Sequence, residues 1–272
     1  MLQPLDEVPA DVWGEVARNV RGIFADVDDT LTEHGTLSEQ AYAALCDARR
    51  AGLRLVLVTG RPLGWAEVLC ALFPIDAAIA ENGAAAALPG GERLYFEDEA
   101  ARRAGDVARA AALARVRHEL PEVRTAADQA HRAIDLAFDI AERVQLDEPT
   151  IARLVAVLDA ESLSTTRSSI HLHGTYSRGD KAKMAARVAR HLWGAGPDDV
   201  RDRYLFVGDS PNDAAAFAFF RHSVGVANVR DHEARLRALG ALPAYLTRAR
   251  CGAGFAELVD RLLGARALPP AP

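Results

Sequence analysis

Two pairs of aspartates in this sequence have a spacing that could hold a metal ion beside a phosphate. Asp26 and Asp28 directly follow the apolar run Gly22-Ile23-Phe24-Ala25, and Asp209 and Asp213 follow the run 204–208. Four carboxylates in one cleft repel one another unless a cation lies between them. Oxygen ligands without histidine or cysteine suit Mg²⁺, which pairs readily with a substrate phosphate. The sequence therefore predicts a Mg²⁺ site at Asp26, Asp28, Asp209 and Asp213.

The spacing of the first two aspartates also predicts a division of labour. A carboxylate beside a metal can attack phosphorus, while a second carboxyl two residues later protonates the leaving oxygen and then activates water. Asp26 and Asp28 fit these roles. The transferring phosphoryl group also needs fixed hydrogen-bond donors and a positive charge. We expect these groups at Thr59, Gly60, Lys181 and Asn212.

The pattern around these residues predicts a parallel sheet with helices between its strands. The run 22–25 reads as a buried strand, and a helix capped by Ser38 and ended at Gly52 follows it. A second strand is expected at 53–58, a helix from Pro62 to about Phe73, and a third strand at 75–80. Strands and helices that alternate in this way are typical of a doubly wound α/β fold. Ligands bind at the carboxyl ends of the strands in such sheets.

The same rhythm returns near the carboxyl end of the chain. A helix is expected at 181–192, strands at 204–207, 223–226 and 244–247, a helix after Pro211, and a last helix at 255–263. The intervening stretch has a different organisation, with a long Ala/Arg-rich helix at 97–120, a helix at 149–159, and strands at 133–140, 163–166 and 169–173. We therefore expect a catalytic core at 1–92 and 174–272, interrupted by an α+β insert at 93–173.

The order of these motifs resembles the haloacid dehalogenase (HAD) superfamily of hydrolases. The matching segments are DxDxT at 26–30, TGR at 59–61, the lysine of GDKAKMA at 181, and GDSPND at 208–213, with ENGA at 81–84 and VGVAN at 224–228. The chain is most similar to subfamily IIB, which carries a type C2B cap and includes Cof-like, sucrose-phosphate and mannosyl-3-phosphoglycerate phosphatases. The resemblance implies a Rossmann-like HAD core with an inserted C2B-type cap domain.

The resemblance also implies residue roles. Asp26 would be the nucleophile that forms an aspartyl-phosphate, and Asp28 the general acid and base. Mg²⁺ would bind Asp26, the Asp28 carbonyl and Asp209, with Asp213 in support. The expected activity is Mg²⁺-dependent hydrolysis of a small phosphomonoester, a sugar phosphate or glycosyl phosphate. Two alternatives remain open: a phosphosugar mutase on the same scaffold, or a phosphate-binding protein without turnover.

Recognition of the leaving group is expected from polar residues around the insert. The candidates are Arg61, Asn82, Arg132, Ser169, His171 and His173. The two histidines alternate along a strand-like run, which is compatible with a zinc pair, with substrate contact, or with a solvated strand face.

Composition limits the partners and the compartment. With 32 basic and 38 acidic residues, the formal net charge is −6, so no bulk positive field favours a nucleic acid or an anionic membrane. The three cysteines are widely spaced, as expected in a reducing compartment. The start of the chain lacks the basic and apolar regions of a signal peptide, and no apolar run is long enough to span a bilayer. We therefore expect a cytoplasmic monomer or homodimer that binds a small phosphorylated metabolite.

Overall fold

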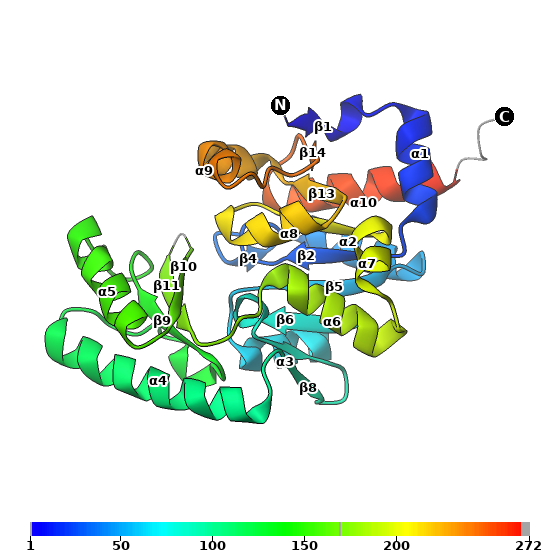
Figure 1. Cartoon of the computed structure of the whole chain (residues 1–272). Helices are drawn as coiled ribbons and strands as arrows, with labels where there is room; N and C mark the ends of the chain where they lie inside the picture. The colour runs from blue at the N-terminus through cyan, green and yellow to red at the C-terminus, as the bar shows by residue number, and fades with distance from the viewer. Residues whose placement is uncertain (1, 169, 268–272) are drawn as a thin grey trace.

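The computed structural model describes residues 2–168 and 170–267, which form two lobes of unequal size (Figure 1). The large lobe contains a nine-stranded sheet with helices on both faces, and the small lobe contains a three-stranded sheet with two helices. The chain leaves the large lobe once, after β8, and returns at α6. The predicted fold class, an α/β protein with a doubly wound sheet, is confirmed.

The order of strands in the large sheet agrees with the predicted topology. The first seven strands across the sheet pair with their neighbours in parallel, and the last two, β7 and β8, pair in antiparallel fashion. In their order across the sheet the strands are β1 (Gln3–Pro4), β14 (Tyr245–Leu246), β13 (His222–Gly225), β12 (Tyr204–Gly208), β2 (Gly22–Asp26), β5 (Arg54–Val58), β6 (Ala77–Ala80), β7 (Ala85–Ala87) and β8 (Arg93–Tyr95).

Helices cover both faces of this sheet. One face packs against α1 (Ala10–Asn19), α2 (Glu39–Arg50), α3 (Leu63–Leu72) and α10 (Cys251–Ala267). The other packs against α6 (Lys181–Trp193), α7 (Pro197–Arg203), α8 (Ala214–Phe219) and α9 (Glu233–Ala238). Because both faces are covered, all five residues of β2 are buried, which explains its continuous apolar run.

The boundaries of α2 show how local sequence sets an element. The Ser38 hydroxyl accepts a hydrogen bond from the Ala41 amide at 3.1 Å, as a residue that caps a helix start does. Gly52 follows the helix with a φ of +77°, a conformation that glycine adopts without steric penalty. Both features were predicted.

Several short elements were not predicted. The strand β7 consists of three alanines, a residue with little preference for strands, and it forms because all three are buried between neighbours. The helix α7 has one buried residue, Val200, so its sequence carries no periodicity. A small hairpin, β3 (Thr32–Glu33) and β4 (Thr36–Leu37), follows β2 and connects it to α2.

The small lobe has its own apolar core. Its antiparallel sheet has the order β10 (Ser164–Arg167), β11 (His171–Thr175) and β9 (Asp135–Asp139), packed against α4 (Glu99–Glu119) and α5 (Glu148–Ala160). The strand β8 lies at the start of the predicted insert, but it pairs with β7 in the large sheet. Among the described residues, no helix has the length and apolar character needed to cross a membrane.

Candidate active site

Parallel pairing brings the polar ends of three strands together. Ala25 on β2 pairs with Val207 on β12, and Asp26 pairs with Val58 on β5. The residues after each strand therefore lie at one edge of the sheet, as the sequence predicted.

Three of the four predicted metal ligands form a buried cluster at this edge. Carboxylate oxygens of Asp26, Asp209 and Asp213 lie within 4.8 Å of one another. Lys181, only 1% exposed, donates from Nζ to Asp26 Oδ1 at 2.5 Å and to Asp213 Oδ1 at 2.6 Å. A longer contact of 3.3 Å joins Lys181 to Asn212 Oδ1. The helix α6 supplies this lysine from its first residue, as predicted.

The burial of these carboxylates has an electrostatic consequence. Burial raises the pKa of Asp26 well above its ordinary value, and the charges of Asp209 and Asp213 raise it further while Lys181 lowers it. Burial and the charge of Asp213 likewise raise the pKa of Asp209. One ammonium thus leaves the cluster short of positive charge, which is the condition under which a divalent cation binds favourably.

Hydrogen bonds from neighbouring residues hold two carboxylates of this cluster. Asp213 Oδ2 accepts hydrogen bonds from the amides of Asp209 and Ser210 at 2.9 and 3.2 Å. Asn228, from the VGVAN segment, donates to Asp209 Oδ2 at 3.1 Å. A Cβ at Gly208 would lie 2.4 Å from Asp213 Oδ2, so only glycine fits there.

Asp28 lies beside this cluster but its carboxylate has a different partner. Arg61 donates to Asp28 Oδ1 from Nη2 at 2.8 Å and to both carboxylate oxygens from Nε at 3.1 Å. Thr59 Oγ1 donates to Asp28 Oδ2 at 3.3 Å. The guanidinium of Arg61 also lies over the ring of Trp65, with its carbon 5.0 Å from the ring centroid. The carboxylate of Asp28 is thus paired with Arg61, whereas those of Asp26 and Asp213 are paired with Lys181.

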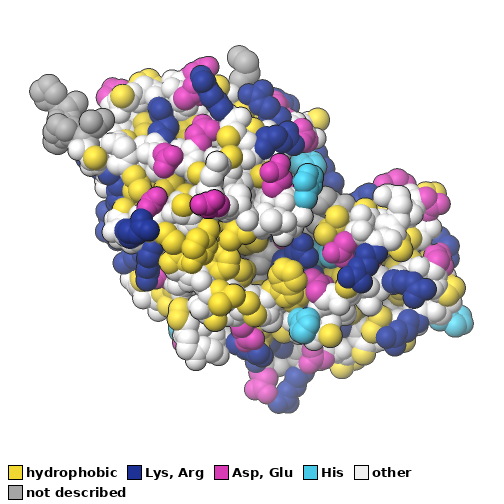
Figure 2. Space-filling model, turned by 180° about the vertical axis from the view of Figure 1, so that it is seen from behind, with side chains coloured by type: hydrophobic (Ala, Val, Ile, Leu, Met, Phe, Trp, Pro, Cys, Tyr) yellow, Lys and Arg dark blue, Asp and Glu magenta, His cyan; other side chains and the backbone are white. Residues whose placement is uncertain are grey.

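A cavity of about 710 Å³ opens from the acidic cluster to the small lobe. Figure 2 shows the furrow between the lobes from behind, with basic and histidine side chains along it. From the large lobe the cavity is lined by Asp26, Asp28, Asp29, His34, Gly35, Gly60, Arg61, Asp209, Ser210, Pro211, Asn212, His232 and Arg235. From the small lobe it is lined by Arg132, Ala141, Glu142, Arg167, Ser168, Ile170, His171 and His173.

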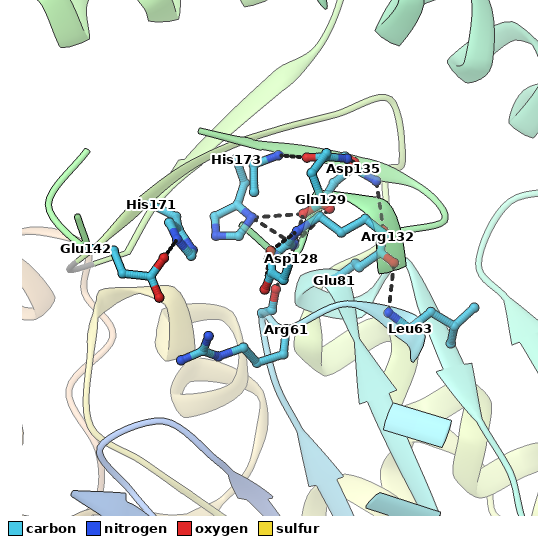
Figure 3. Close-up of polar contacts among 12 residues, drawn as sticks. Arg61, Leu63, Glu81, Asp128, Gln129, Arg132, Asp135, Glu142, His171 and His173 are labelled. Carbon is cyan, nitrogen blue, oxygen red and sulfur yellow. Dashed lines mark hydrogen bonds and ion pairs between the residues drawn. The ribbon is translucent and has the colours of Figure 1, made fainter. Parts of the chain in front are cut away.

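Both predicted histidines reach this cavity, each with a carboxylate beside it (Figure 3). His171 Nε2 lies 3.1 Å from Glu142 Oε2, and His173 Nδ1 lies 2.9 Å from Asp135 Oδ2. Burial lowers the pKa of His171, although Glu142 opposes this effect. Within the described residues, the only metal-compatible group of three acidic, histidine or cysteine side chains is Asp26, Asp209 and Asp213, so the zinc interpretation of the histidines finds no support.

The other predicted substrate residues occupy different positions. Arg132 lines the cavity, but its donors bond to Asp128, Asp135 and the Gly60 carbonyl, the last at 3.0 Å. Asn82 packs against Gly60: a Cβ added at Gly60 would lie 3.0 Å from Asn82 Oδ1. Asn82 is not among the residues that line the cavity. Ser169 lies outside the described residues.

Sequence reasoning missed several cavity residues. Glu142 and Arg167 lie just beyond the ends of predicted strands, where periodicity carries no information about direction. Arg167 pairs with the exposed Glu148 and offered no signal in the sequence. Ser168, which the sequence also suggested as a substrate contact, does line the cavity.

A family profile matches the first part of this arrangement of motifs. The profile of haloacid dehalogenase-like hydrolases matches residues 23–108, which span β2, β5, β6 and the start of α4. This part of the chain therefore matches the haloacid dehalogenase-like hydrolases. The predicted resemblance to this superfamily is confirmed over these residues.

Three similar proteins each align over about nine-tenths of the chain. A phosphoglycolate phosphatase from Methanothermobacter thermautotrophicus is 29% identical over 247 residues, covering 90% of this chain and 100% of the relative. The sucrose-phosphatase of Synechocystis sp. PCC6803, solved with sucrose and phosphate, has a TM-score of 0.65 at 17% identity and covers 90% of this chain and 98% of its own. The solved structure of a HAD subclass IIB sugar phosphatase has a TM-score of 0.61 at 16% identity, and the alignment covers 90% of this chain and 100% of that chain.

These likenesses bear on two further predictions. The fold is that of HAD subclass IIB proteins, as predicted. The family match and the relatives named phosphoglycolate phosphatase agree with the predicted phosphatase class.

Proposed function

We propose that this enzyme is a Mg²⁺-dependent phosphatase that hydrolyses a sugar phosphate or glycosyl phosphate through Asp26. The observation that carries the proposal is the buried contact of Lys181 with Asp26 and Asp213, beside Asp209. Buried ionisable groups with perturbed pKa values in a cavity are typical of catalytic sites.

The donor set fits Mg²⁺. Its ligands would be Asp26, Asp209 and the backbone carbonyl of Asp28. Asp213 would orient Asp209, because its carboxylate accepts a hydrogen bond from the Asp209 amide. These are oxygen atoms only, which suits a hard cation. When bound, Mg²⁺ neutralises the carboxylates and withdraws charge from the phosphoryl oxygens.

In the proposed reaction, Asp26 attacks phosphorus while the bond to the leaving oxygen breaks. Asp28 gives a proton to that oxygen, and the alcohol leaves. Asp28 then takes a proton from water, the water oxygen attacks phosphorus, and the bond to Asp26 breaks to release inorganic phosphate. Each role is within reach of the substrate because both carboxylates line the same cavity.

Lys181, Thr59, the Gly60 amide and Asn212 would hold the phosphoryl group. Lys181 supplies the positive charge at the base of the site, where burial raises the strength of its interaction with a phosphate. Gly60 and Asn212 line the same cavity as Asp26.

The small lobe would serve as the predicted cap domain, whose first three residues (93–95) instead form β8 of the core sheet. Its cavity face is polar, with hydrogen-bonding groups on Arg132, Glu142, Arg167, His171 and His173. A sugar presents several hydroxyl groups, and a site that bonds to them discriminates strongly against analogues that lack them.

A small phosphorylated carboxylic acid is the second candidate substrate. The relative named phosphoglycolate phosphatase aligns over 90% of this chain. Arg61 and Arg167 line the cavity and could donate hydrogen bonds to a substrate carboxylate.

A panel of phosphorylated metabolites separates these candidates. The purified enzyme with Mg²⁺ is incubated with sugar phosphates and with 2-phosphoglycolate, and free phosphate is measured. A higher kcat/KM for a sugar phosphate than for 2-phosphoglycolate supports the first candidate, and a higher kcat/KM for 2-phosphoglycolate supports the second. Transfer of phosphate between hydroxyls without release indicates a mutase.

A further inference from the structure

The turn after β6 has an unusual backbone. Glu81, Asn82 and Gly83 have φ angles of +49°, +55° and +101°. Side chains other than glycine rarely adopt this left-handed region, and two in succession persist only where surrounding contacts hold them. Backbone outliers of this kind cluster at functional sites.

This turn contacts both parts of the site that hold phosphate in the proposal. The amide of Asn82 donates to the Thr59 carbonyl at 3.2 Å, and the amide of Glu81 donates to the Arg61 carbonyl at 3.0 Å. On its other side, a Cβ at Gly83 would lie 2.3 Å from the carbonyl of Asp180, the residue before Lys181. The turn is therefore wedged between the TGR loop and the start of α6.

The side chain of Glu81 reaches out of this turn to the small lobe. It is 2% exposed, and its two oxygens accept four backbone hydrogen bonds (Figure 3). Oε1 accepts from Leu63 at 3.0 Å and Ala133 at 2.7 Å, and Oε2 accepts from Ile134 at 2.6 Å and Asp135 at 2.8 Å. Leu63 begins α3 in the large lobe, whereas the other three donors lead into β9 of the small lobe.

The segment that Glu81 holds carries cavity residues of the small lobe. Arg132 precedes the three bonded amides and bonds back to Gly60. Asp135, the last of them, bonds to His173. One carboxylate thus sets the position of a short segment from which two cavity side chains are oriented.

The position of this carboxyl is electrostatically unfavourable. Burial and the charge of Asp135 raise the pKa of Glu81 to about 7, although the backbone amides counteract them. An ionisable group retained where burial disfavours its charge is better explained by a geometric role than by stability.

We propose that Glu81 is a positioning residue that fixes the small lobe over the phosphate site by binding the backbone amides at the start of β9. The functional meaning of this contact rests on the proposed function, since it assumes that the small lobe binds the leaving group. The contact itself can be tested without turnover.

The first test is amide hydrogen exchange on the whole protein without substrate. In Glu81→Gln, the side-chain NH₂ faces two backbone donors in either orientation, so at least two bonds are lost. Glu81→Asp keeps the carboxylate but shortens the side chain by one methylene, which draws the carboxylate away from the four amides. This variant replaces Glu81→Gln in the test if the glutamine variant does not fold. Glu81→Gln should lose protection at Ala133, or at Ile134 and Asp135, according to the side-chain orientation, and Glu81→Asp should lose it at all three amides, with β2 and β12 unchanged.

The matched control is Ser223→Ala. Ser223 is also a buried polar residue with two backbone bonds, to the Phe217 carbonyl and from the Ala244 amide, but it lies on β13. This variant should leave protection at 133–135 unchanged. Loss of protection there in the control, or its retention in both Glu81 variants, would overturn the proposal.

The second test compares two substrates with each variant. Because a displacement of about 1 Å can reduce a rate by about 10²-fold, we expect kcat/KM for the best metabolite of the panel to fall by about that factor. Hydrolysis of p-nitrophenyl phosphate, whose aryl group needs no contact with the small lobe, should fall far less. Equal losses on both substrates, or no loss on either, would overturn the positioning role. If no phosphate ester is hydrolysed by the wild type, the proposed function fails while the exchange result still decides the contact.

Discussion

Replacement of Lys181 by methionine tests the electrostatic balance of the site. The methionine fills a similar volume but removes the ammonium that contacts Asp26 and Asp213 at 2.5 and 2.6 Å. Asp209, the third member of the cluster, then also loses its nearest positive charge. We expect the folded protein to be destabilised in the absence of a divalent cation.

The size of this effect follows from burial. Removal of one partner of a buried ion pair destabilises a protein by about 3–5 kcal/mol, because the remaining charge is uncompensated. Protonation limits the loss, since the pKa values of Asp26 and Asp209 are already raised. An acid whose pKa is raised by folding loses its contribution to stability as the pH rises. The deficit of Lys181→Met should therefore be near 3 kcal/mol at alkaline pH and smaller at acidic pH.

Chemical denaturation followed by tryptophan fluorescence measures this deficit. All three tryptophans, Trp13, Trp65 and Trp193, belong to the large lobe, so the signal reports its unfolding. The control is Lys183→Met, since Lys183 lies on the same helix but is 57% exposed in its pair with Asp180. This control should lose less than about 1 kcal/mol. Equal losses for the two variants in chelator at alkaline pH would refute the electrostatic account.

Three further predictions concern the metal, the small lobe and its histidines. EDTA should abolish hydrolysis of p-nitrophenyl phosphate, and Mg²⁺ but not Ca²⁺ should restore it, because Ca²⁺ favours a larger and looser coordination; full activity in chelator would argue against the site. Burial opposes ionisation of Asp135, but Arg132 and His173 lower its pKa to about 2. The ionised Asp135 therefore contributes about 2 kcal/mol to the free energy of unfolding above pH 4, and this contribution is lost as the pH falls through 2. The difference in unfolding free energy between wild type and Asp135→Asn should narrow over that range, and a constant difference would contradict this prediction. His171→Ala should reduce kcat/KM for the best sugar phosphate far more than for p-nitrophenyl phosphate, and equal losses would assign His171 to structure.

Much of the candidate site at the sheet edge could be predicted because it follows from local order. Asp26, Thr59 and Asp209 each come at or just after the end of a parallel strand, and such ends meet at one edge whatever the loops between them do. The apolar runs identified the strands, and the polar residues after them identified the site. Lys181 was recognisable because a cation at a helix start is unfavourable without a partner.

The contacts between the lobes could not be predicted in this way. Glu81 binds an amide 52 residues away, and Arg132 binds a carbonyl 72 residues away. These bonds depend on how the two lobes pack, which hydrophobic periodicity does not encode. The sequence indicated that Arg132 was polar beside an apolar run, but not that its donors would be used within the protein.

The nucleophilic role of Asp26 is tested most directly by trapping its phosphorylated form. In Asp28→Asn, the leaving group of p-nitrophenyl phosphate departs without an acid, but water lacks the base that activates it. Rapid acid quench in the presence of Mg²⁺, followed by mass spectrometry of the peptides, should find one added phosphoryl group on the peptide that contains Asp26. Asp26→Asn should show neither this adduct nor release of phosphate. A phosphoryl group on another residue, or turnover of Asp26→Asn near the wild-type rate, would contradict the account.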